Sequence, residues 1–187
     1  DRFLSIIDKQ TTRLNSIIDD LLSLSRLEQS ETPDLELKTY SLQSIIHRSV
    51  QLCSSRAGEK GIDIDSSGVG EIQARVNPQL LEQAVINLID NAVKYSERGS
   101  RVTVRLDEGE DTVQIIVEDK GCGIPASSLD RVFERFYRVD KARSRNLGGT
   151  GLGLAIVKHI ALAHSGEALV KSEFGEGSTF TILLPKI

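Results

Sequence analysis

Residues 1–30 carry apolar side chains at the spacing of a heptad repeat, which places them along one face of a helix. These apolar positions are Leu4, Ile7, Leu14, Ile18 and Leu21. We therefore predict one long helix over this stretch, with a stripe that must be buried against other helices. Pro33 disfavours helix in the residue before it, so we place a linker at residues 31–34.

Beyond the linker, segments of alternating polarity take turns with segments of helical periodicity. We predict strands at residues 35–40, 62–65, 72–76, 101–106, 112–119, 167–173 and 178–185. We predict helices at about residues 41–59, 77–96, 127–133 and 150–164, the first two capped by Ser41 and Asn77. The strands at 62–65 and 72–76 are interpreted as a hairpin pair. This order predicts an α+β sandwich, with helices on one face of a mixed sheet.

Composition places the chain among globular proteins. Its 187 residues suffice for one domain of ordinary size plus an appendage, and they are 39% apolar and 27% charged. The formal charge of −4 gives no reason to expect nucleic-acid binding. No apolar run approaches the ~20 residues of a membrane span, and no secretory signal is visible. Cys53 and Cys122 form no zinc pattern, and a reduced cytosolic pair is favoured over a disulfide.

A first polar cluster lies in the predicted helix at 77–96, in the stretch NLIDNAVKY. Asn87 and Asn91 are four residues apart, so they share a helix face. Their neutral amide oxygens suit a hard cation such as Mg²⁺, which also takes waters and phosphate oxygens. Lys94 can reach a phosphate, and Tyr95 offers a flat face and a hydroxyl. The alternative for this segment is a solvated helix face.

Two glycine-containing stretches follow. In EDKGCGIP, Asp119 ends an apolar strand, and it is either a turn former or a ligand group aimed into a cavity. The two glycines after it remove side chains where something flat could sit. In NLGGTGLGLAIVKH, Gly149, Gly151 and Gly153 lead into a helix, whose N-terminal N–H groups and dipole favour a phosphate.

An aperiodic segment between these stretches contains five cationic residues, Arg135, Arg138, Lys141, Arg143 and Arg145. It is either a solvated surface segment or an anion clamp beside the glycine-rich loop. For any single one of the five residues, the solvated segment is the simpler interpretation.

Taken together, the clusters resemble the ATP-binding domain of bacterial sensor histidine kinases, and they look most like the phosphate-regulon sensor kinases. The matching stretches are the N box NLIDNAVKY, the G1 box DKGCGI, the F box FERFYR, the G2 box GGTGLGL and a G3-like turn FGEGSTF. The resemblance covers about residues 35–187 and implies the Bergerat-type α/β sandwich of gyrase, Hsp90 chaperones and MutL repair proteins. LSLSRLE looks like the end of the family's second dimerisation helix, so residues 1–30 are expected to be that helix.

The resemblance implies an ATP site with Mg²⁺. In it, Asn91 with Asn87 would hold the metal, Asp119 would accept a hydrogen bond from the adenine amino group, and Thr179 would lie near Asp119. The residues implied to contact the nucleotide are Asn87, Asn91, Lys94, Tyr95, Asp119, Gly121, Gly123, Ile124, Gly149, Thr150, Gly151, Leu152, Gly153 and Thr179. The residues implied to act in the transfer are Asn87, Lys94, Arg138 and Arg143.

The family transfers its phosphoryl group to a histidine in a motif like H-E-x-x-T/N-P. His47, His159 and His164 do not stand in such a motif, and His164 is expected to be structural. We therefore expect a kinase domain that acts on a histidine not contained in this sequence, on a dimerisation helix of the same or a second protomer. The resemblance further implies a homodimer, a response regulator as partner, and a location in the cytoplasmic part of a membrane-anchored sensor.

Two other functions stay open at the level of sequence. One is an ATPase of the gyrase or chaperone type. Such enzymes typically carry a water-activating glutamate in the N box, where Asn87 and Asn91 stand here. The other is a nucleotide-binding interaction module without transfer activity.

Overall fold

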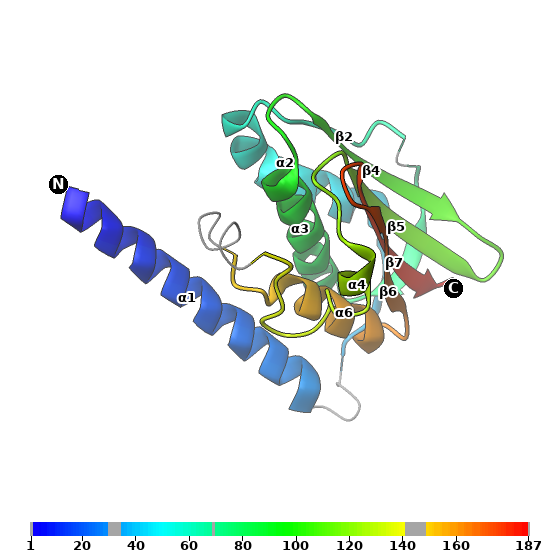
Figure 1. Cartoon of the computed structure of the whole chain (residues 1–187). Coiled ribbons are helices and arrows are strands. Elements are labelled where there is room, and N and C mark those ends of the chain that lie inside the picture. The colour runs from blue at the N-terminus through cyan, green and yellow to red at the C-terminus, as the bar shows by residue number, and fades with distance from the viewer. Residues whose placement is uncertain (1, 30–34, 69, 141–148, 187) are drawn as a thin grey trace.

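A mixed five-stranded sheet forms one layer of the molecule (Figure 1). The computed structural model describes residues 2–29, 35–68, 70–140 and 149–186. Across the sheet, the strands are β2 (Asp63–Asp65), β4 (Arg101–Glu108), β5 (Thr112–Asp119), β7 (Gly177–Pro185) and β6 (Glu167–Glu173). β2 runs parallel to β4, and the other neighbours are antiparallel. The predicted mixed sheet is confirmed.

Helices α2 (Leu42–Glu59), α3 (Pro78–Tyr95) and α6 (Gly153–Ala163) cover one face of this sheet (Figure 1). Their apolar faces and the inward side chains of β4, β5 and β7 form a single buried core. Ser41 and Asn77 cap α2 and α3 as predicted, because each side-chain oxygen accepts a backbone N–H of the first turn. The predicted sandwich with helices on one face is therefore confirmed.

The two short strands predicted as a hairpin do not pair with each other. β2 lies at the edge of the main sheet beside β4, whereas β3 (Gln73–Val76) pairs antiparallel with β1 (Lys38–Ser41) in a separate two-stranded sheet. The hairpin prediction is wrong. Alternating polarity shows that a segment is extended, but the partner of so short a strand is decided by the packing around it.

Helix α1 (Arg2–Gln29) is the single long helix that the heptad pattern predicts. Its C-terminal half packs on the sandwich, where Leu24 is 1% exposed and Ile17 contacts the core. The predicted stripe is not buried within the described residues, since its side chains are between 39% and 66% exposed, at Leu4, Ile7, Leu14, Ile18 and Leu21. The predicted linker at residues 31–34 lies outside the described residues. Among the helices described, none combines the length and the apolar character that crossing a bilayer requires.

Helix α3 is fixed at its C-terminal end by one lysine. Lys60, the residue after α2, donates from Nζ to the carbonyl oxygens of Val93, Lys94 and Ser96 at 2.9, 2.8 and 3.2 Å. The last carbonyls of a helix have no partner within the helix, and a cation there also interacts favourably with the helix dipole. Lys60 therefore holds the end of the helix that carries Asn87 and Asn91.

The N-terminal end of α3 is fixed by His164. Nε2 of His164 accepts the Asn77 N–H at 2.9 Å, and Nδ1 lies 2.8 Å from the Ile160 carbonyl oxygen. Because Nε2 accepts, Nδ1 carries the proton and the ring is neutral. Burial lowers the pKa of His164, which favours the same neutral form. The predicted structural role of His164 is confirmed.

We expect Lys60→Met to lower the free energy of unfolding by about 2–4 kcal/mol, because charge-assisted bonds to three helix-end carbonyls are lost together. Urea denaturation followed by circular dichroism measures this. Lys38→Met is the matched control, since Lys38 is 59% exposed in a surface ion pair, and its loss is expected to change stability by less than about 1 kcal/mol. Equal stabilities of the two variants would contradict the capping role.

Candidate functional site

The polar clusters predicted from the sequence line one cavity of about 500 Å³. The cavity lies between α3, the turn after β5, the loop before α6 and the segment of residues 132–140. The predicted residues on its wall are Asn87, Asn91, Lys94, Tyr95, Asp119, Gly123, Ile124, Arg138, Gly149, Thr150, Gly151 and Gly153. The fold thus gathers amide, carboxylate and cationic groups from distant parts of the sequence around one space.

Asp119 supplies a buried carboxylate to the cavity wall, and the residue is only 6% exposed. Oδ1 of Asp119 accepts the Gly121 N–H at 2.8 Å, and the Ser178 N–H also donates to the carboxylate. Burial raises the pKa of Asp119 to about 6, although the two N–H donors act to lower it. The group is therefore ionised at neutral pH, and it is a strong acceptor for a donor on a ligand.

The glycines after Asp119 are required by contacts within the protein. A Cβ added at Gly121 would lie 2.6 Å from the Tyr95 carbonyl oxygen and 2.7 Å from Asp119 Oδ1. Gly123 has a φ of +62°, and a Cβ there would overlap the Glu173 carbonyl oxygen. These glycines let the turn pack against the end of α3 and against the turn between β6 and β7. That is a different reason from the predicted one, in which the missing side chains leave room for something flat. Of the two glycines, only Gly123 lines the cavity.

Two cationic side chains lie beside Gly149. Nη2 of Arg138 donates to the Gly149 carbonyl oxygen at 2.6 Å, and a Cβ added at Gly149 would lie 2.6 Å from Lys94 Nζ. Nε of Arg138 and Nδ2 of Asn87 are buried without a hydrogen-bond partner in the structure. Buried donors without acceptors are destabilising, and the anionic oxygens of a ligand would satisfy them.

The α3 amides fit a magnesium ion that keeps further ligands. Asn87 and Asn91 lie one turn apart and both line the cavity. Asp90, between them in sequence, also lines the cavity and is paired with Arg56. The amide oxygens of both side chains are hard ligands, which Mg²⁺ prefers. This donor set suits Mg²⁺ with water and phosphate oxygens completing the coordination.

The loop before α6 has a backbone contact on one side and the Asn87 side chain on the other. The Phe136 N–H donates to the Gly151 carbonyl oxygen at 2.8 Å, and a Cβ added at Gly151 would lie 3.0 Å from the Phe136 backbone. Gly151 has a φ of +78°, which glycine adopts readily. A Cβ added at Gly153 would lie 3.6 Å from Asn87 Oδ1, so the start of α6 faces the α3 amide. The loop therefore has a defined path between α3 and the segment of residues 132–140.

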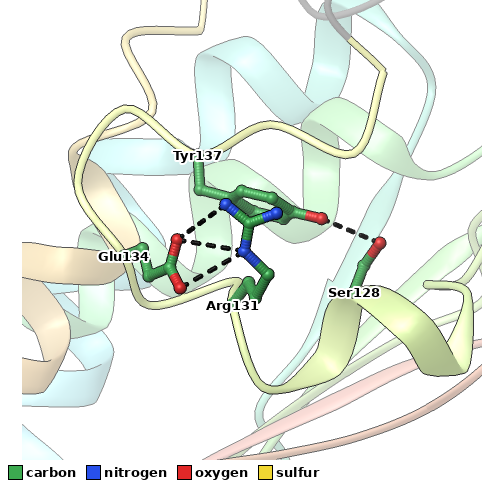
Figure 2. A network of polar contacts seen from close by, with 4 residues as sticks. All are labelled: Ser128, Arg131, Glu134 and Tyr137. Atoms are coloured by element: carbon green, nitrogen blue, oxygen red, sulfur yellow. Dashed lines mark hydrogen bonds and ion pairs between the residues drawn. The ribbon is translucent and has the colours of Figure 1, made fainter.

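A polar network orders the segment that follows the short helix α4 (Ala126–Leu129) (Figure 2). The Arg131 guanidinium lies over the Tyr137 ring, 4.3 Å from its centroid, and pairs with Glu134 at 3.0 Å. The Tyr137 hydroxyl donates to Ser128 Oγ at 2.9 Å. Tyr137 lines the cavity but is missing from the predicted site. The aperiodic sequence gave no reason to select it, and the Arg-x-x-Glu spacing is the one signal of local order.

Some predicted residues lie elsewhere. Thr179 pairs with Glu118 across the strands and does not line the cavity, whereas Ser178 is the partner of Asp119 and lines it. Successive strand residues point to opposite faces, so Ser178 and not Thr179 lies on the cavity wall, and the role implied for Thr179 stays a prediction. The Leu152 side chain is fully buried in the core, and its N–H donates to the Thr150 hydroxyl at 3.2 Å. Arg143 lies outside the described residues.

Asp20 of α1 enters the cavity wall from the far end of the sequence. Its carboxylate accepts a hydrogen bond from the Thr150 hydroxyl at 3.1 Å. Burial raises the pKa of Asp20, and the hydrogen bond from Thr150 acts against this. No sequence pattern indicates the contact, because it depends on how α1 packs against α6.

A profile of the "Histidine kinase-, DNA gyrase B-, and HSP90-like ATPase" family matches residues 76–187, which include every predicted box. The chain belongs to this family. The matched residues contain α3, the sheet except β2, and the cavity wall apart from its contributions from Asp20 and Arg56. The expected Bergerat-type fold and the recognition of an ATP-binding domain are thereby confirmed.

Named relatives in this family are sensor kinases. The chain is 40% identical to the sensor-like histidine kinase SenX3 of Mycolicibacterium smegmatis, over 99% of the chain and 48% of the relative. It is 37% identical to the sensor histidine kinase WalK of Bacillus subtilis, over 98% of the chain and 30% of the relative. The chain thus spans about half, or less, of the length of these relatives.

Two solved structures are similar to this chain over most of its length. The mycobacterial sensor histidine kinase MprB is 32% identical with a TM-score of 0.71, and the match covers 80% of this chain and 97% of that one. Full-length ShkA, whose structure is a complex with AMPPNP, is 30% identical with a TM-score of 0.80, over 99% of this chain and 38% of that one. The chain therefore corresponds to the ATP-binding catalytic domain of a sensor kinase, preceded by one helix.

Proposed function

We propose that this chain binds ATP with Mg²⁺ and catalyses transfer of the γ-phosphoryl group to a histidine of a dimerisation helix. One observation carries the proposal. A single cavity joins the buried acceptor Asp119 to Lys94, Arg138 and the unpartnered donor of Asn87. These are the groups that an adenine amino group and a triphosphate require.

Each wall group then has a role. Asp119 accepts the adenine amino group, and it selects adenine over guanine, which presents an oxygen at that position. Lys94, Arg138 and the backbone of the loop from Gly149 bind phosphate oxygens, and Arg143 adds a further cation. Asn87 and Asn91 would hold Mg²⁺, which would supply positive charge beside the phosphates. In phosphoryl transfer, catalysis comes mainly from such positioning and charge stabilisation.

The acceptor is proposed to be a histidine other than the three in this sequence. Both ring nitrogens of His164 are engaged within the protein. His47 is exposed on α2 and lines a separate shallow depression with Asp63 and Arg101. His159 lies within α6 and does not line the cavity. The relatives are named as sensor histidine kinases, which supports a histidine as the acceptor. The resemblance of the sequence motifs further implies that this histidine lies on a dimerisation helix, and it implies a homodimer, a response regulator as partner, and a location in the cytoplasmic part of a membrane-anchored sensor.

A hydrolytic ATPase is less well supported. Hydrolysis needs a group that activates water, and Asp90 is the acidic residue of the N box. Its carboxylate is already engaged by the Arg56 guanidinium, which competes with a water molecule for the same oxygens. The adjacent cavity-lining positions are the amides Asn87 and Asn91, which cannot accept a proton at neutral pH.

The decisive experiment incubates the protein with γ-labelled ATP and Mg²⁺, alone and with a separately supplied dimerisation domain from WalK. We expect label on the supplied domain that is acid-labile and base-stable, as phosphohistidine is, and no label on this chain. Steady release of inorganic phosphate without labelled protein would favour the ATPase. Binding without either product would favour an interaction module.

A further prediction concerns Asp20. Its carboxylate lies on the wall of the cavity, where it would repel the triphosphate. We expect Asp20→Asn to tighten ATP binding about three- to tenfold at low salt, since two charges ~5 Å apart in water interact by about 1 kcal/mol. Calorimetry at pH 8 measures this. Asp19→Asn is the control, because this substitution removes the same charge from an exposed position on the same helix. An equal gain in both variants would contradict the specific role of Asp20.

A further inference from the structure

Phe174 is the most exposed of the large apolar side chains in the described part of the chain, at 70%. It lies in the turn between β6 and β7 and lines the same cavity as Asp119. Single exposed apolar residues are common on protein surfaces and by themselves mean little. Phe174 differs because its ring borders a cavity and because its backbone is held firmly in place.

Contacts between backbones attach the Phe174 turn to the turn that follows Asp119. The Gly175 N–H donates to the Cys122 carbonyl oxygen at 2.9 Å. A Cβ added at Gly123 would lie 2.9 Å from Phe174 Cα, so the two chain segments are already in contact. The aromatic ring is therefore carried on a backbone that is fixed relative to Asp119.

Ser172 links the same two turns through its side chain. Its hydroxyl accepts the Ile124 N–H at 2.8 Å and donates to the Gly177 carbonyl oxygen at 2.6 Å. Gly177, at the end of the turn, has a φ of +132° and packs against the Asp119 backbone. The hairpin end and the Asp119 turn thus form one unit on the cavity wall.

We propose that Phe174 is a positioning residue for the nucleotide base and stacks on the flat face of the purine whose edge Asp119 binds. The inference rests on the proposed function. A carboxylate recognises the edge of a base but leaves its faces to water or to apolar groups. An aromatic ring at the mouth of the cavity covers one face, and both apolar surfaces leave water.

Stacking predicts a particular pattern of affinities. ATP and ADP carry the same adenine base, so Phe174 should contribute equally to the binding of both. Inorganic tripolyphosphate has no base on which the ring could stack. Replacement of a stacked aromatic residue by alanine typically lowers affinity about 5- to 150-fold. We therefore expect Phe174→Ala to weaken ATP and ADP binding by this factor and to leave tripolyphosphate binding within about twofold. Calorimetry with each compound measures the pattern.

A second variant reports the contact directly. The chain contains no tryptophan, so Phe174→Trp introduces a unique fluorophore at the proposed stacking position. We expect its emission to change on addition of ATP or ADP and to stay unchanged with tripolyphosphate, with ATP affinity retained. Leu169→Trp and Leu169→Ala are the controls, because Leu169 of β6 is 39% exposed and does not line the cavity.

The outcomes separate the two proposals. If the parent protein binds ATP and Phe174→Ala binds it equally well, the stacking role is wrong and the proposed function stands. Equal weakening of ATP and tripolyphosphate would also overturn stacking, because it would show a general disturbance of the site. If the parent protein does not bind ATP at all, both proposals fall.

Discussion

Asp119→Asn is expected to weaken ATP binding by about 10- to 150-fold. A hydrogen bond to a charged acceptor contributes about 1.5–3 kcal/mol, and the neutral amide of asparagine loses that charge. Calorimetry at pH 8, where the carboxylate is ionised, measures the effect. Glu118→Gln is the matched control, since this substitution removes the same charge one residue away, from a side chain that is 43% exposed. If a folded Asp119→Asn variant binds ATP with unchanged affinity, Asp119 does not contact the nucleotide.

The same residue predicts a pH dependence of binding. Because burial raises the pKa of Asp119 to about 6, the carboxylate of the free protein takes up a proton as the pH falls from 7 to 5. At pH 5 about one-tenth of it remains ionised, which lowers ATP affinity about tenfold relative to neutral pH. The nucleotide's own titration acts on parent and variant equally, so the ratio of their affinities isolates Asp119. A ratio that is constant across this range would contradict the assignment.

Stability without nucleotide is expected to change in the opposite direction. The folded protein binds the Asp119 proton more tightly than the unfolded chain, in which the carboxyl has its ordinary pKa of 3.8. Stability therefore rises as the pH falls through 6, by about 1 kcal/mol between pH 7 and pH 5. Asp119→Asn lacks this contribution, so the difference between the unfolding free energies of the two proteins should follow that curve. Urea denaturation at a series of pH values measures it.

The sequence predicts where helices and strands form better than it predicts which strands pair. The heptad pattern, the caps at Ser41 and Asn77, and the alternation in β4 and β5 are local features, and local features decide whether a segment is helical or extended. Pairing is a property of the whole fold. Local patterns predict that β2 and β3 pair with each other, but in the fold each pairs with a strand from another part of the sequence.

Site prediction follows the same division. The boxes identify Asp119, Lys94 and Arg138, because their residue types carry the chemistry within short motifs. Positions that depend on register or on packing are missed. Ser178 in place of Thr179 follows from the pairing of β5 with β7, and Asp20 follows from the packing of α1 on the sandwich. Neither is visible in a stretch of sequence read by itself.

Asn91→Ala is expected to remove most of the effect of Mg²⁺ on ATP binding. Loss of even an outer-shell partner typically lowers metal affinity about 10- to 100-fold, and loss of a direct oxygen ligand should cost no less. In the parent protein, added Mg²⁺ should tighten ATP binding. In the variant, this enhancement should fall by at least about tenfold, while binding of ATP in excess chelator stays within about threefold.

The control for this experiment is Gln79→Ala, an exposed position on the same helix α3 that does not line the cavity. Both variants should melt within a few degrees of the parent, because neither substitution removes a residue of the hydrophobic core. Asn87→Ala should also lose Mg²⁺ enhancement, since its amide lies one turn away on the same wall. If Asn91→Ala titrates with Mg²⁺ like the parent, the metal is held by other oxygens. In that case, the α3 amides would serve only as hydrogen-bonding groups for phosphate.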